Sequence, residues 1–210
     1  MNRIEHNESK WIFPFVEYSP KTAKDSKLPL IIQLHGAGER GEGGDDLARV
    51  DVHGFSKTIK DADYNCIFIM PQCPTNTFWA ARVESIIKFI EQVKAEYDVD
   101  ENRVYLTGLS MGGFGTWYTA MAAPELFAAI VPVCGGGMAW NTGRLDMPIW
   151  VFHGADDTVV SPNQSDEMVA ALRAREKDVT YTRIDGVAHC VWEYAYNEEL
   201  LMWLLGKSRR

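Results

Sequence analysis

The chain of 210 residues is long enough for one domain with a substantial core and too short for two ordinary domains joined by a linker. Hydrophobic residues make up 46% and charged residues 24% of the chain, which excludes a disordered or fibrous protein. Acidic residues outnumber basic ones by 29 to 21, and a net charge of -8 argues against phosphate backbones and anionic lipids as partners. We therefore expect one globular domain over residues 1–210, with neither nucleic acid nor a membrane as partner.

The termini and the cysteines give no sign of targeting or of metal binding. The N-terminal residues, MNRIEHNESKWIFPF, carry scattered charges and lack the apolar core of a signal peptide. No apolar run approaches the roughly 18 residues that a membrane span requires. The four cysteines have neither C-x-x-C pairing nor metal-ligand spacing. These features predict a cytoplasmic protein with reduced thiols and no bound metal.

Several apolar segments predict strands. Residues 11–20 come first, and Pro14 and Pro20 there suit an antiparallel edge strand better than a central one. Most of the others are continuously apolar, as strands of a sheet covered on both faces must be. They span residues 28–35, 65–72, 103–109, 127–135, 147–154 and 178–185.

Helical patterns lie between these runs. In residues 79–97 apolar side chains recur at 3.6-residue spacing, which predicts an amphipathic helix. Weaker patterns cover residues 164–175 and 191–205. Strands that alternate with helices predict an α/β fold with a mostly parallel sheet, right-handed crossovers and helices on both faces. Such sheets bind ligands outside the carboxyl ends of their strands.

A glycine-rich turn follows the first of the buried strands. Gly36, Gly38 and Gly41 have the spacing G-x-G-x-x-G, which either holds the pyrophosphate of a dinucleotide or directs a backbone N–H at a developing oxyanion. A dinucleotide site requires a helix that begins at the glycines and an acidic residue after the next strand. The chain instead continues EGGDDL, and the next strand ends in Pro71 and Gln72. The oxyanion interpretation is favoured, and no organic cofactor is expected.

A candidate nucleophile lies in the G-x-S-x-G sequence of residues 108–112, between a predicted strand and a predicted helix. Small residues on either side of Ser110 allow a sharp turn that exposes the hydroxyl. A serine hydroxyl becomes a good nucleophile only when a base takes its proton and an acid orients that base. Ser110 therefore predicts a histidine and a carboxylate later in the chain.

His189 is the candidate base among the five histidines, because it lies between the last predicted strand and the last predicted helix. His6 lies in a polar stretch and His53 in a region with no clear element, so both are interpreted as surface residues. His35 and His153 precede glycines at strand ends, where turn packing and hydrogen bonding are their expected roles.

The orienting acid is expected after the strand that precedes the last one. Asp156 and Asp157 are adjacent there, directly after MPIWVFHGA. Neighbouring side chains point in different directions, so normally only one of the two reaches the imidazole. The residues themselves leave that choice open.

Four motifs in chain order carry a resemblance to a known family: LHGAGERG, TGLSMGGFGTW, VFHGADDTVV and GVAHCVW. Together they resemble the α/β-hydrolase fold, and within it the compact serine esterase branch that includes a peptidase-like and phospholipase/carboxylesterase group, akin to dienelactone hydrolases and feruloyl or acetyl esterases. The likeness runs from about residue 28 to the C-terminus. The resemblance is specific for the fold and much less so for the substrate.

The resemblance implies roles for the site residues. It places the acid four residues after the histidine of the VFHG motif, which selects Asp157 and gives the chain order Ser110, Asp157, His189. It also implies an oxyanion hole made by the backbone N–H groups of Ala37 and Met111.

Two further residues match the Gly-Glu-Arg that follows the oxyanion turn in this branch. Glu39 and Arg40 are candidate substrate contacts, and an ion pair that holds the loop is an equally good interpretation. Trp140, in the GGGMAW segment, is another candidate contact, whereas Trp79 and Trp192 are better interpreted as packing residues at helix starts.

The predicted function is hydrolysis of carboxylic esters through an acyl-serine, with no metal or organic cofactor. Only about a dozen residues separate Cys134 from Met147, which leaves no room for the helical cap of many lipases. An open cleft suits a short acyl chain on a large or polar alcohol, such as an acylated carbohydrate, or an aromatic ester. The alternatives are a serine peptidase that acts on short peptides and an inactive binding protein of the same fold. Nothing in the sequence indicates the oligomeric state.

Overall fold

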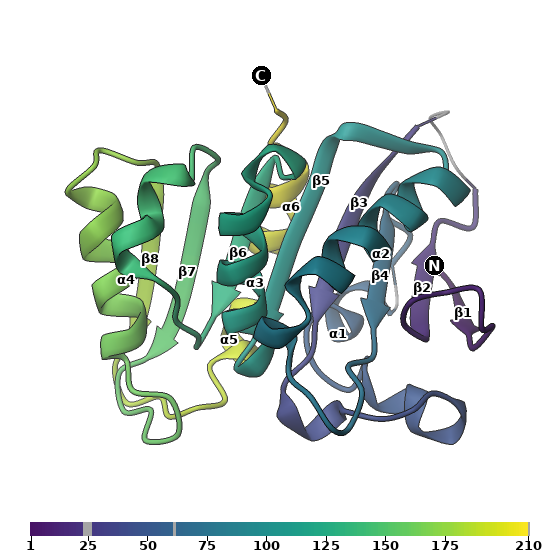
Figure 1. The fold of residues 1–210 in the computed structure, drawn as a ribbon, viewed down its shortest axis with the longest axis horizontal. Coiled ribbons are helices and arrows are strands. Elements are labelled where there is room, and N and C mark those ends of the chain that lie inside the picture. The colour runs from purple at the N-terminus through teal and green to yellow at the C-terminus, as the bar shows by residue number, and fades with distance from the viewer. Residues whose placement is uncertain (23–26, 61, 210) are drawn as a thin grey trace.

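A computed structural model describes residues 1–22, 27–60 and 62–209. The described residues form one sheet of eight strands in the order β1-β2-β4-β3-β5-β6-β7-β8 (Figure 1). In chain order these strands are β1 (Asn2–His6), β2 (Phe15–Ser19), β3 (Leu28–Leu34), β4 (Ile67–Pro71), β5 (Val99–Leu109), β6 (Ala129–Val133), β7 (Ile149–Gly154) and β8 (Val179–Ile184).

The six strands from β3 to β8 run parallel, which confirms the mostly parallel sheet. β1 and β2 add an antiparallel pair on the β4 side. The predicted edge strand is β2, but its place at the edge is wrong, because β2 lies between β1 and β4. β1 is not expected from the sequence, because its residues are polar and mostly exposed. Backbone pairing with β2, rather than burial of side chains, makes this segment a strand.

The helices are α1 (Ser56–Ile59), α2 (Val83–Glu96), α3 (Met111–Ala122), α4 (Asn163–Arg173), α5 (Trp192–Ala195) and α6 (Glu198–Leu205), with 3-10 turns η1 (Ala37–Glu39), η2 (Gly44–Arg49), η3 (Trp79–Ala81), η4 (Pro124–Leu126) and η5 (Ala139–Arg144). The helix expected over 79–97 is therefore a 3-10 turn followed by α2. The one expected over 191–205 is broken into α5 and α6, because the side chain of Asn197 accepts a hydrogen bond from the N–H of Leu200 and starts a new helix there.

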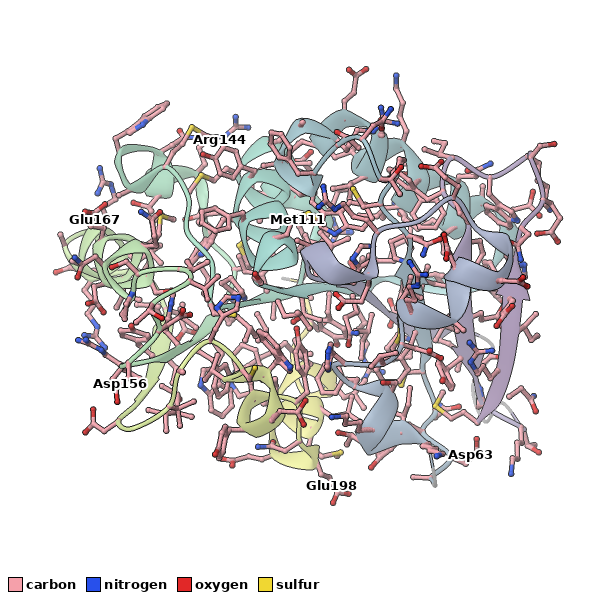
Figure 2. The ribbon with its side chains drawn as sticks, turned by 90° about the horizontal axis from the view of Figure 1, so that it is seen from below. Asp63, Met111, Arg144, Asp156, Glu167 and Glu198 are labelled. Carbon is pink, nitrogen blue, oxygen red and sulfur yellow. The ribbon has the colours of Figure 1, made fainter. Side chains whose placement is uncertain are left out.

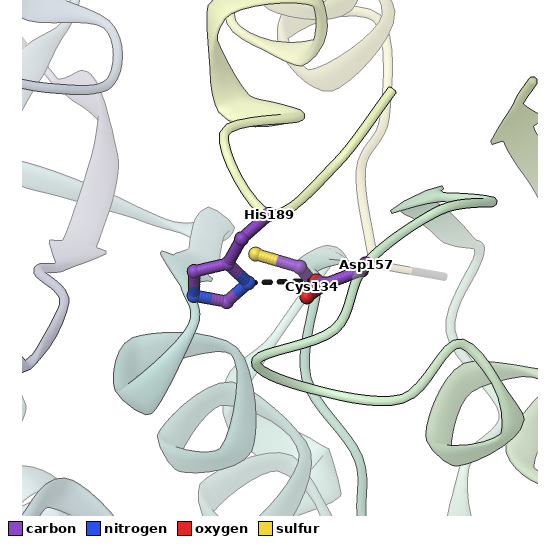
Figure 3. A group of neighbouring side chains, drawn as sticks. All are labelled: Cys134, Asp157 and His189. Carbon is purple, nitrogen blue, oxygen red and sulfur yellow. Dashed lines mark hydrogen bonds and ion pairs between the residues drawn. The ribbon is translucent and has the colours of Figure 1, made fainter. Parts of the chain in front are cut away.

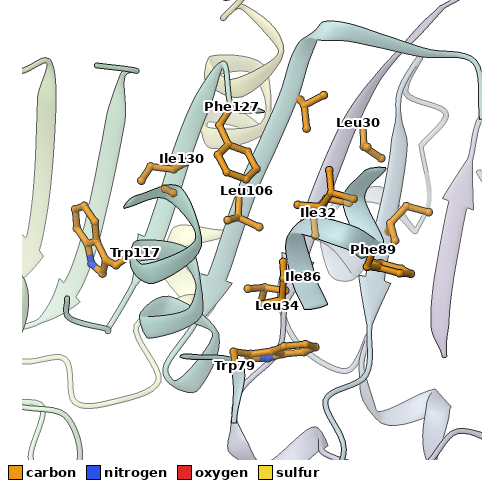
Figure 4. Close-up of a cluster of buried hydrophobic side chains, with 14 of the residues drawn as sticks. Leu30, Ile32, Leu34, Trp79, Ile86, Phe89, Leu106, Trp117, Phe127 and Ile130 are labelled. Carbon is orange, nitrogen blue, oxygen red and sulfur yellow. The ribbon is translucent and has the colours of Figure 1, made fainter. Parts of the chain in front are cut away.

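Helices cover both faces of the sheet. α2, α3 and α4 lie on the near face in Figure 1, and α1, α5 and α6 lie on the far face. Alternate residues of β3 pack into the hydrophobic clusters on the two faces of the sheet. Leu30, Ile32 and Leu34 belong to one cluster, together with Trp79 and Phe89 (Figure 4), and Ile31 belongs to the other. Full burial of each such side chain stabilises the fold by about 1.5–3 kcal/mol. Burial on both faces explains why β3 is apolar almost throughout.

The carboxyl ends of the parallel strands meet at one edge of the sheet, at the bottom of Figure 1. Residues 134–148, which connect β6 to β7, contain only the turn η5, so this connection inserts no helical cap over the edge. Seen toward that edge in Figure 2, Met111 lies near the middle of the molecule, and Asp156, Arg144 and Glu198 lie at its periphery. Within the described residues, no helix is both long and apolar enough to cross a lipid bilayer.

Candidate active site

Ser110 occupies a strained turn between β5 and α3. Its φ of 53° and ψ of -116° lie in a region that favours glycine, and holding a serine there costs about 1–3 kcal/mol. The glycines on either side allow the turn to pack closely. A Cβ on Gly108 would overlap the carbonyl oxygen of Gly112, and a Cβ on Gly112 would overlap that of Leu34. The G-x-S-x-G pattern thus has a steric cause: the first turn of α3 lies directly against the end of β3.

The structure brings together the three residues expected from the sequence. Nε2 of His189 lies 2.9 Å from Oγ of Ser110, and Nδ1 of His189 lies 2.7 Å from Oδ2 of Asp157. These residues come from loops after β5, β7 and β8. A carboxylate only accepts hydrogen bonds, so the network assigns the proton to Nδ1 and leaves Nε2 to accept the hydroxyl proton of Ser110.

Asp157 is the residue that reaches His189. Its side chain is buried, and Oδ1 accepts hydrogen bonds of 2.9 Å from the N–H groups of Val159 and Val160. Burial raises the pKa of Asp157, but the hydrogen bonds from His189 and from these two N–H groups together outweigh burial and lower it below its usual value. The adjacent Asp156 is exposed and lies at the periphery in Figure 2. The carboxylate at 157 is therefore ionised beside the imidazole at neutral pH.

His153 lies next to Asp157 and contacts the same loop. It is fully buried at the end of β7, its Nε2 lies 2.9 Å from the carbonyl oxygen of Val160, and its Nδ1 lies 2.7 Å from Oγ of Ser165. Burial lowers the pKa of His153, so the ring is neutral although Nε2 lies only 3.3 Å from Oδ2 of Asp157. The packing and hydrogen-bonding role expected for this histidine is confirmed.

The buried thiol of Cys134 lies beside the acid and the base (Figure 3). Ligand atoms of Cys134, Asp157 and His189 lie within 4.8 Å of one another, so the group is a geometric candidate for a metal site. It fits one poorly. Burial raises the pKa of the Cys134 thiol well above its usual range, whereas a metal needs the thiolate. The His189 and Asp157 atoms are also hydrogen-bonded to each other. All four cysteines are free thiols.

Two backbone N–H groups lie next to the serine turn. Ala37 begins η1 and Met111 begins α3, and N–H groups at a helix start have no partner within the helix. The turn that follows β3 lies beside the serine, since a Cβ built on Gly36 would lie 3.8 Å from Cβ of Ser110. The N-terminus of α3 also points its positive end at this spot, which favours negative charge. The arrangement can hold an oxyanion beside Ser110.

His35 holds the turn that carries Ala37. Nε2 of His35 accepts a hydrogen bond of 2.9 Å from the N–H of Cys73, so Nδ1 carries the proton that it shares with the carbonyl oxygen of Gly36. Burial lowers the pKa of His35 to about 4, so the ring is neutral at physiological pH. Trp79 packs edge-on against it and donates from Nε1 to its carbonyl oxygen at 3.0 Å. His35 and Trp79 therefore have the packing roles that the sequence predicts.

The glycine-rich loop is fixed by two polar side chains. Arg40 donates to the carbonyl oxygens of Ala37, Thr75 and Thr77. Gln72, which is fully buried after β4, donates to the carbonyl oxygens of Glu39 and Asp46 and accepts from the N–H of Gly43. The loop contains short 3-10 turns where a dinucleotide site would need a helix. Arg40 thus braces the loop through carbonyl groups and forms no ion pair with Glu39 within the described part of the chain.

Glu39 and His53 belong to the connection between β3 and β4 and lie on the side of Gly36 and Trp192, which neighbour Ser110 and His189. Oε2 of Glu39 is buried and has no hydrogen-bond partner among the described residues, and a Cβ on Gly36 would lie 3.0 Å from it. His53 is half-buried rather than a surface residue, with its ring 5.5 Å from that of Trp192. Trp192 in turn packs edge-on against His189 at 5.2 Å. No motif marked His53, because only the loop geometry brings it here.

Trp140, the remaining candidate contact, is 74% exposed. Trp140 is the second residue of the turn η5, which begins at Ala139 and ends at Arg144. Arg144 lies at the periphery of the molecule in Figure 2. A role in substrate binding stays a prediction for this residue.

Comparisons with known proteins agree with the fold. The model of the prolyl oligopeptidase family matches residues 80–143, which include Ser110. The chain is 27% identical over 154 residues to the bifunctional acetylxylan esterase/xylanase XynS20E of Neocallimastix patriciarum, covering 70% of this chain and 22% of the relative. It is 27% identical over 146 residues to poly(3-hydroxyalkanoate) depolymerase C of Paucimonas lemoignei, covering 63% of this chain and 34% of the relative.

A solved structure of a thermostable esterase is similar over 99% of this chain, with a TM-score of 0.83 and 35% identity. The chain spans 63% of that esterase and about a fifth to a third of the curated relatives, at 22% and 34%. The sheet topology, the turn at Ser110 and these similarities agree with one another. The chain therefore has the α/β-hydrolase fold and is similar to esterases of that fold.

Proposed function

We propose that the protein hydrolyses carboxylic esters, with Ser110 as nucleophile, His189 as base and then acid, and Asp157 as the residue that orients His189. The observation that carries this proposal is the continuous chain of two hydrogen bonds, 2.9 Å and 2.7 Å long, from a strained serine through the imidazole to a buried carboxylate. A nucleophile, its base and an orienting acid in contact are the features of acyl transfer through a covalent intermediate.

The first half of the reaction forms the acyl-enzyme. Oγ of Ser110 attacks the carbonyl carbon while its proton moves to Nε2 of His189, and the charged imidazole is stabilised by ionised Asp157. The oxyanion of the tetrahedral intermediate accepts hydrogen bonds from the N–H groups of Ala37 and Met111, and one such donor is typically worth about 3 kcal/mol. His189 then returns the proton to the departing alcohol oxygen.

The second half releases the acid. Water enters where the alcohol left, gives a proton to Nε2 of His189 and attacks the acyl carbon. Collapse of the second tetrahedral intermediate returns the proton to Oγ of Ser110. The steps use only side chains, backbone N–H groups and water.

The substrate class proposed is a short acyl group on a large or polar alcohol, such as an acylated carbohydrate. The absence of a helical segment between β6 and β7 within the described chain supports an uncapped site. One relative is named an acetylxylan esterase and another a polyhydroxyalkanoate depolymerase, so both names refer to esters of hydroxylated compounds. Glu39, Arg40 and Trp140 are the proposed contacts. The cytoplasmic location stays a prediction, which cell fractionation tests.

Replacement of the nucleophile tests the proposal. Ser110→Ala should lower kcat for p-nitrophenyl acetate by several orders of magnitude while circular dichroism and melting temperature stay those of the wild type. Wild type should react with a fluorophosphonate probe at Ser110, and the variant should not. A variant that keeps near-normal turnover overturns the mechanism. Failure of the wild type to react with the probe instead supports an inactive binding protein.

A peptidase is the second candidate, because the family model that matches residues 80–143 is that of the prolyl oligopeptidase family. Amides need better protonation of the leaving group than esters, but they use the same triad. Paired substrates with the same acyl group, one a p-nitrophenyl ester and one a p-nitroanilide, separate the two activities. The esterase proposal expects turnover of the ester and no measurable turnover of the anilide.

A further inference from the structure

We propose that Glu39 and His53 form a subsite that binds a free hydroxyl group on the alcohol part of the ester, next to the scissile bond. The subsite would make the enzyme prefer esters of diols, polyols or sugars to esters of plain alkyl alcohols. This inference rests on the proposed esterase function and adds the feature that selects the substrate.

Glu39 offers an unused acceptor beside the nucleophile. Its side chain is 15% exposed, and Oε2 has no hydrogen-bond partner among the described residues. A Cβ on Gly36 would lie 3.0 Å from this oxygen and 3.8 Å from Cβ of Ser110, so Gly36 lies between Glu39 and the serine. The nearby ring of His35 cannot serve as a donor, because its Nδ1–H is given to the carbonyl oxygen of Gly36. A buried carboxylate oxygen without a donor is costly unless a ligand supplies one.

His53 faces Glu39 from the next loop. Nε2 of His53 lies 4.0 Å from Oε1 of Glu39, so the two groups are neighbours but are too far apart for a direct hydrogen bond. Nδ1 of His53 is buried and also lacks a hydrogen-bond partner in the described chain, with the carboxylate of Glu193 at 3.5 Å. The two side chains therefore lie next to each other, and Oε2 of Glu39 lacks a hydrogen-bond partner in the described chain, whereas Nδ1 of His53 faces Glu193.

The pair lies on the side of the site where the alcohol must leave. His189 gives its proton to the alcohol oxygen, so the alcohol part of the substrate lies toward His189. Trp192 joins the two places, since its ring lies 5.2 Å from that of His189 and 5.5 Å from that of His53. A hydroxyl one or two carbons from the ester oxygen would therefore lie near His53 and Glu39.

Both loops are held rigidly by buried amides, which suits a subsite that must discriminate. Gln33, on β3, donates from Nε2 to the carbonyl oxygen of His53 and accepts from the N–H of Phe55. Gln72 donates to the carbonyl oxygen of Glu39. A preorganised pair loses little entropy when the ligand binds.

The chemistry of the pair fits a hydroxyl group better than a cation. A hydroxyl both donates and accepts, so it can donate its one hydrogen to Glu39 while its oxygen accepts from the imidazole N–H of His53. An ammonium group only donates, and Lys57 already places a positive charge 2.6 Å from the Glu193 carboxylate that faces His53.

Two esters of equal size test the subsite. 2-Hydroxyethyl acetate and n-propyl acetate differ by one hydroxyl in place of one methyl group. The wild type should prefer the hydroxyethyl ester in kcat/KM by about tenfold, the factor that about 1.4 kcal/mol of hydrogen bonding corresponds to. Glu39→Leu should abolish this preference, so that the two acetates are hydrolysed with equal kcat/KM. Glu39→Gln, which keeps an acceptor but no charge, should restore part of the preference.

Further variants separate the subsite from a general effect of charge or packing. His53→Phe keeps a ring against Trp192 and should lower the preference as Glu39→Leu does. Glu42→Gln is the matched control, because Glu42 lies in the same loop but is exposed and bonded to Thr75; it should keep the wild-type preference. Glycerol monoacetate and an O-acetylated methyl xyloside then distinguish a polyol from a sugar as the better source of the hydroxyl.

The outcomes separate this inference from the proposed function. If the wild type hydrolyses both acetates at equal kcat/KM, or if Glu39→Leu keeps the preference, the subsite is refuted and the esterase proposal stands. If the wild type hydrolyses neither these acetates nor p-nitrophenyl acetate, the proposed function itself is refuted. A preference that Glu42→Gln removes as fully as Glu39→Leu also refutes the subsite, because loop charge would then explain it.

Discussion

Nδ1 of His189 lies 2.7 Å from Oδ2 of Asp157, while Oδ1 of the same carboxylate accepts hydrogen bonds from the N–H groups of Val159 and Val160. The carboxylate is thus held by its own loop while it holds the imidazole. This arrangement decides which ring nitrogen carries the proton and keeps Nε2 available for the hydroxyl of Ser110.

Asp157→Asn should disable this arrangement without disturbing the fold. An amide at position 157 can donate to Nδ1 and so favour the tautomer that carries its proton on Nε2, which cannot accept the serine proton. We expect kcat for p-nitrophenyl acetate to fall by about 10³–10⁴-fold. Asp156→Asn is the matched control, since it removes the exposed neighbouring carboxylate, and its kcat should stay that of the wild type. Equal losses in the two variants would contradict the assignment of the acid.

The lowered pKa of Asp157 predicts a pH dependence of stability. Burial raises this pKa, but the hydrogen bonds from His189, Val160 and Val159 together lower it by more than burial raises it. The pKa in the folded state therefore lies below the unfolded value of about 3.9. The ionised group therefore stabilises the fold above the unfolded pKa, and this contribution is lost as the pH falls through the folded pKa. In urea unfolding, the free-energy difference between the wild type and Asp157→Asn should shrink between about pH 5 and pH 2. A difference that stays constant over this range would contradict the prediction.

Gly112→Ala should destabilise the protein because the added Cβ would overlap the carbonyl oxygen of Leu34. Relief requires the first turn of α3 to move away from β3, which should cost at least about 1–3 kcal/mol of unfolding free energy. Gly38→Ala is the matched control, since nothing lies within 4 Å of a Cβ at that position. Chemical unfolding curves of the two variants should therefore differ clearly, and similar midpoints would argue against the close packing of α3 on β3.

Gln72→Leu should weaken both stability and activity. The variant leaves the carbonyl oxygens of Glu39 and Asp46 and the N–H of Gly43 without their buried partner, and each unsatisfied group costs about 1–3 kcal/mol. The same loop carries Ala37, so kcat for p-nitrophenyl acetate should also fall. Gln92→Leu, which loses two bonds to the backbone of Lys10 and Ile12 far from the triad, serves as control. Its kcat should not change, whereas a kcat loss equal to that of Gln72→Leu would contradict the prediction.

The strand pattern and the strained turn at Ser110 could be predicted from the sequence because their causes are local. Strands such as β3 and β4, buried on both faces, must be apolar almost throughout, and this leaves a run that stands out from the polar segments around it. The glycines of the G-x-S-x-G motif report a steric requirement of the backbone at Ser110. The same holds for the amphipathic spacing of α2, which reports one buried face.

Only the tertiary structure decided the features that depend on partners far away in the chain. β1 is a strand because β2 offers its backbone groups, and its polar side chains carry no periodic signal. The sequence alone did not distinguish Asp156 from Asp157 as the acid. In the structure, the N–H groups of Val159 and Val160 donate to Asp157 and orient its carboxylate toward His189. The neighbourhood of Glu39 and His53 likewise depends on Gln33 and Gln72, which hold two loops by hydrogen bonds over long sequence separations. Burial of a strand and the sterics of a turn depend on residues that are close in sequence, so the sequence alone predicts them. Contacts between loops depend on how the whole sheet packs, so only the tertiary structure determines them.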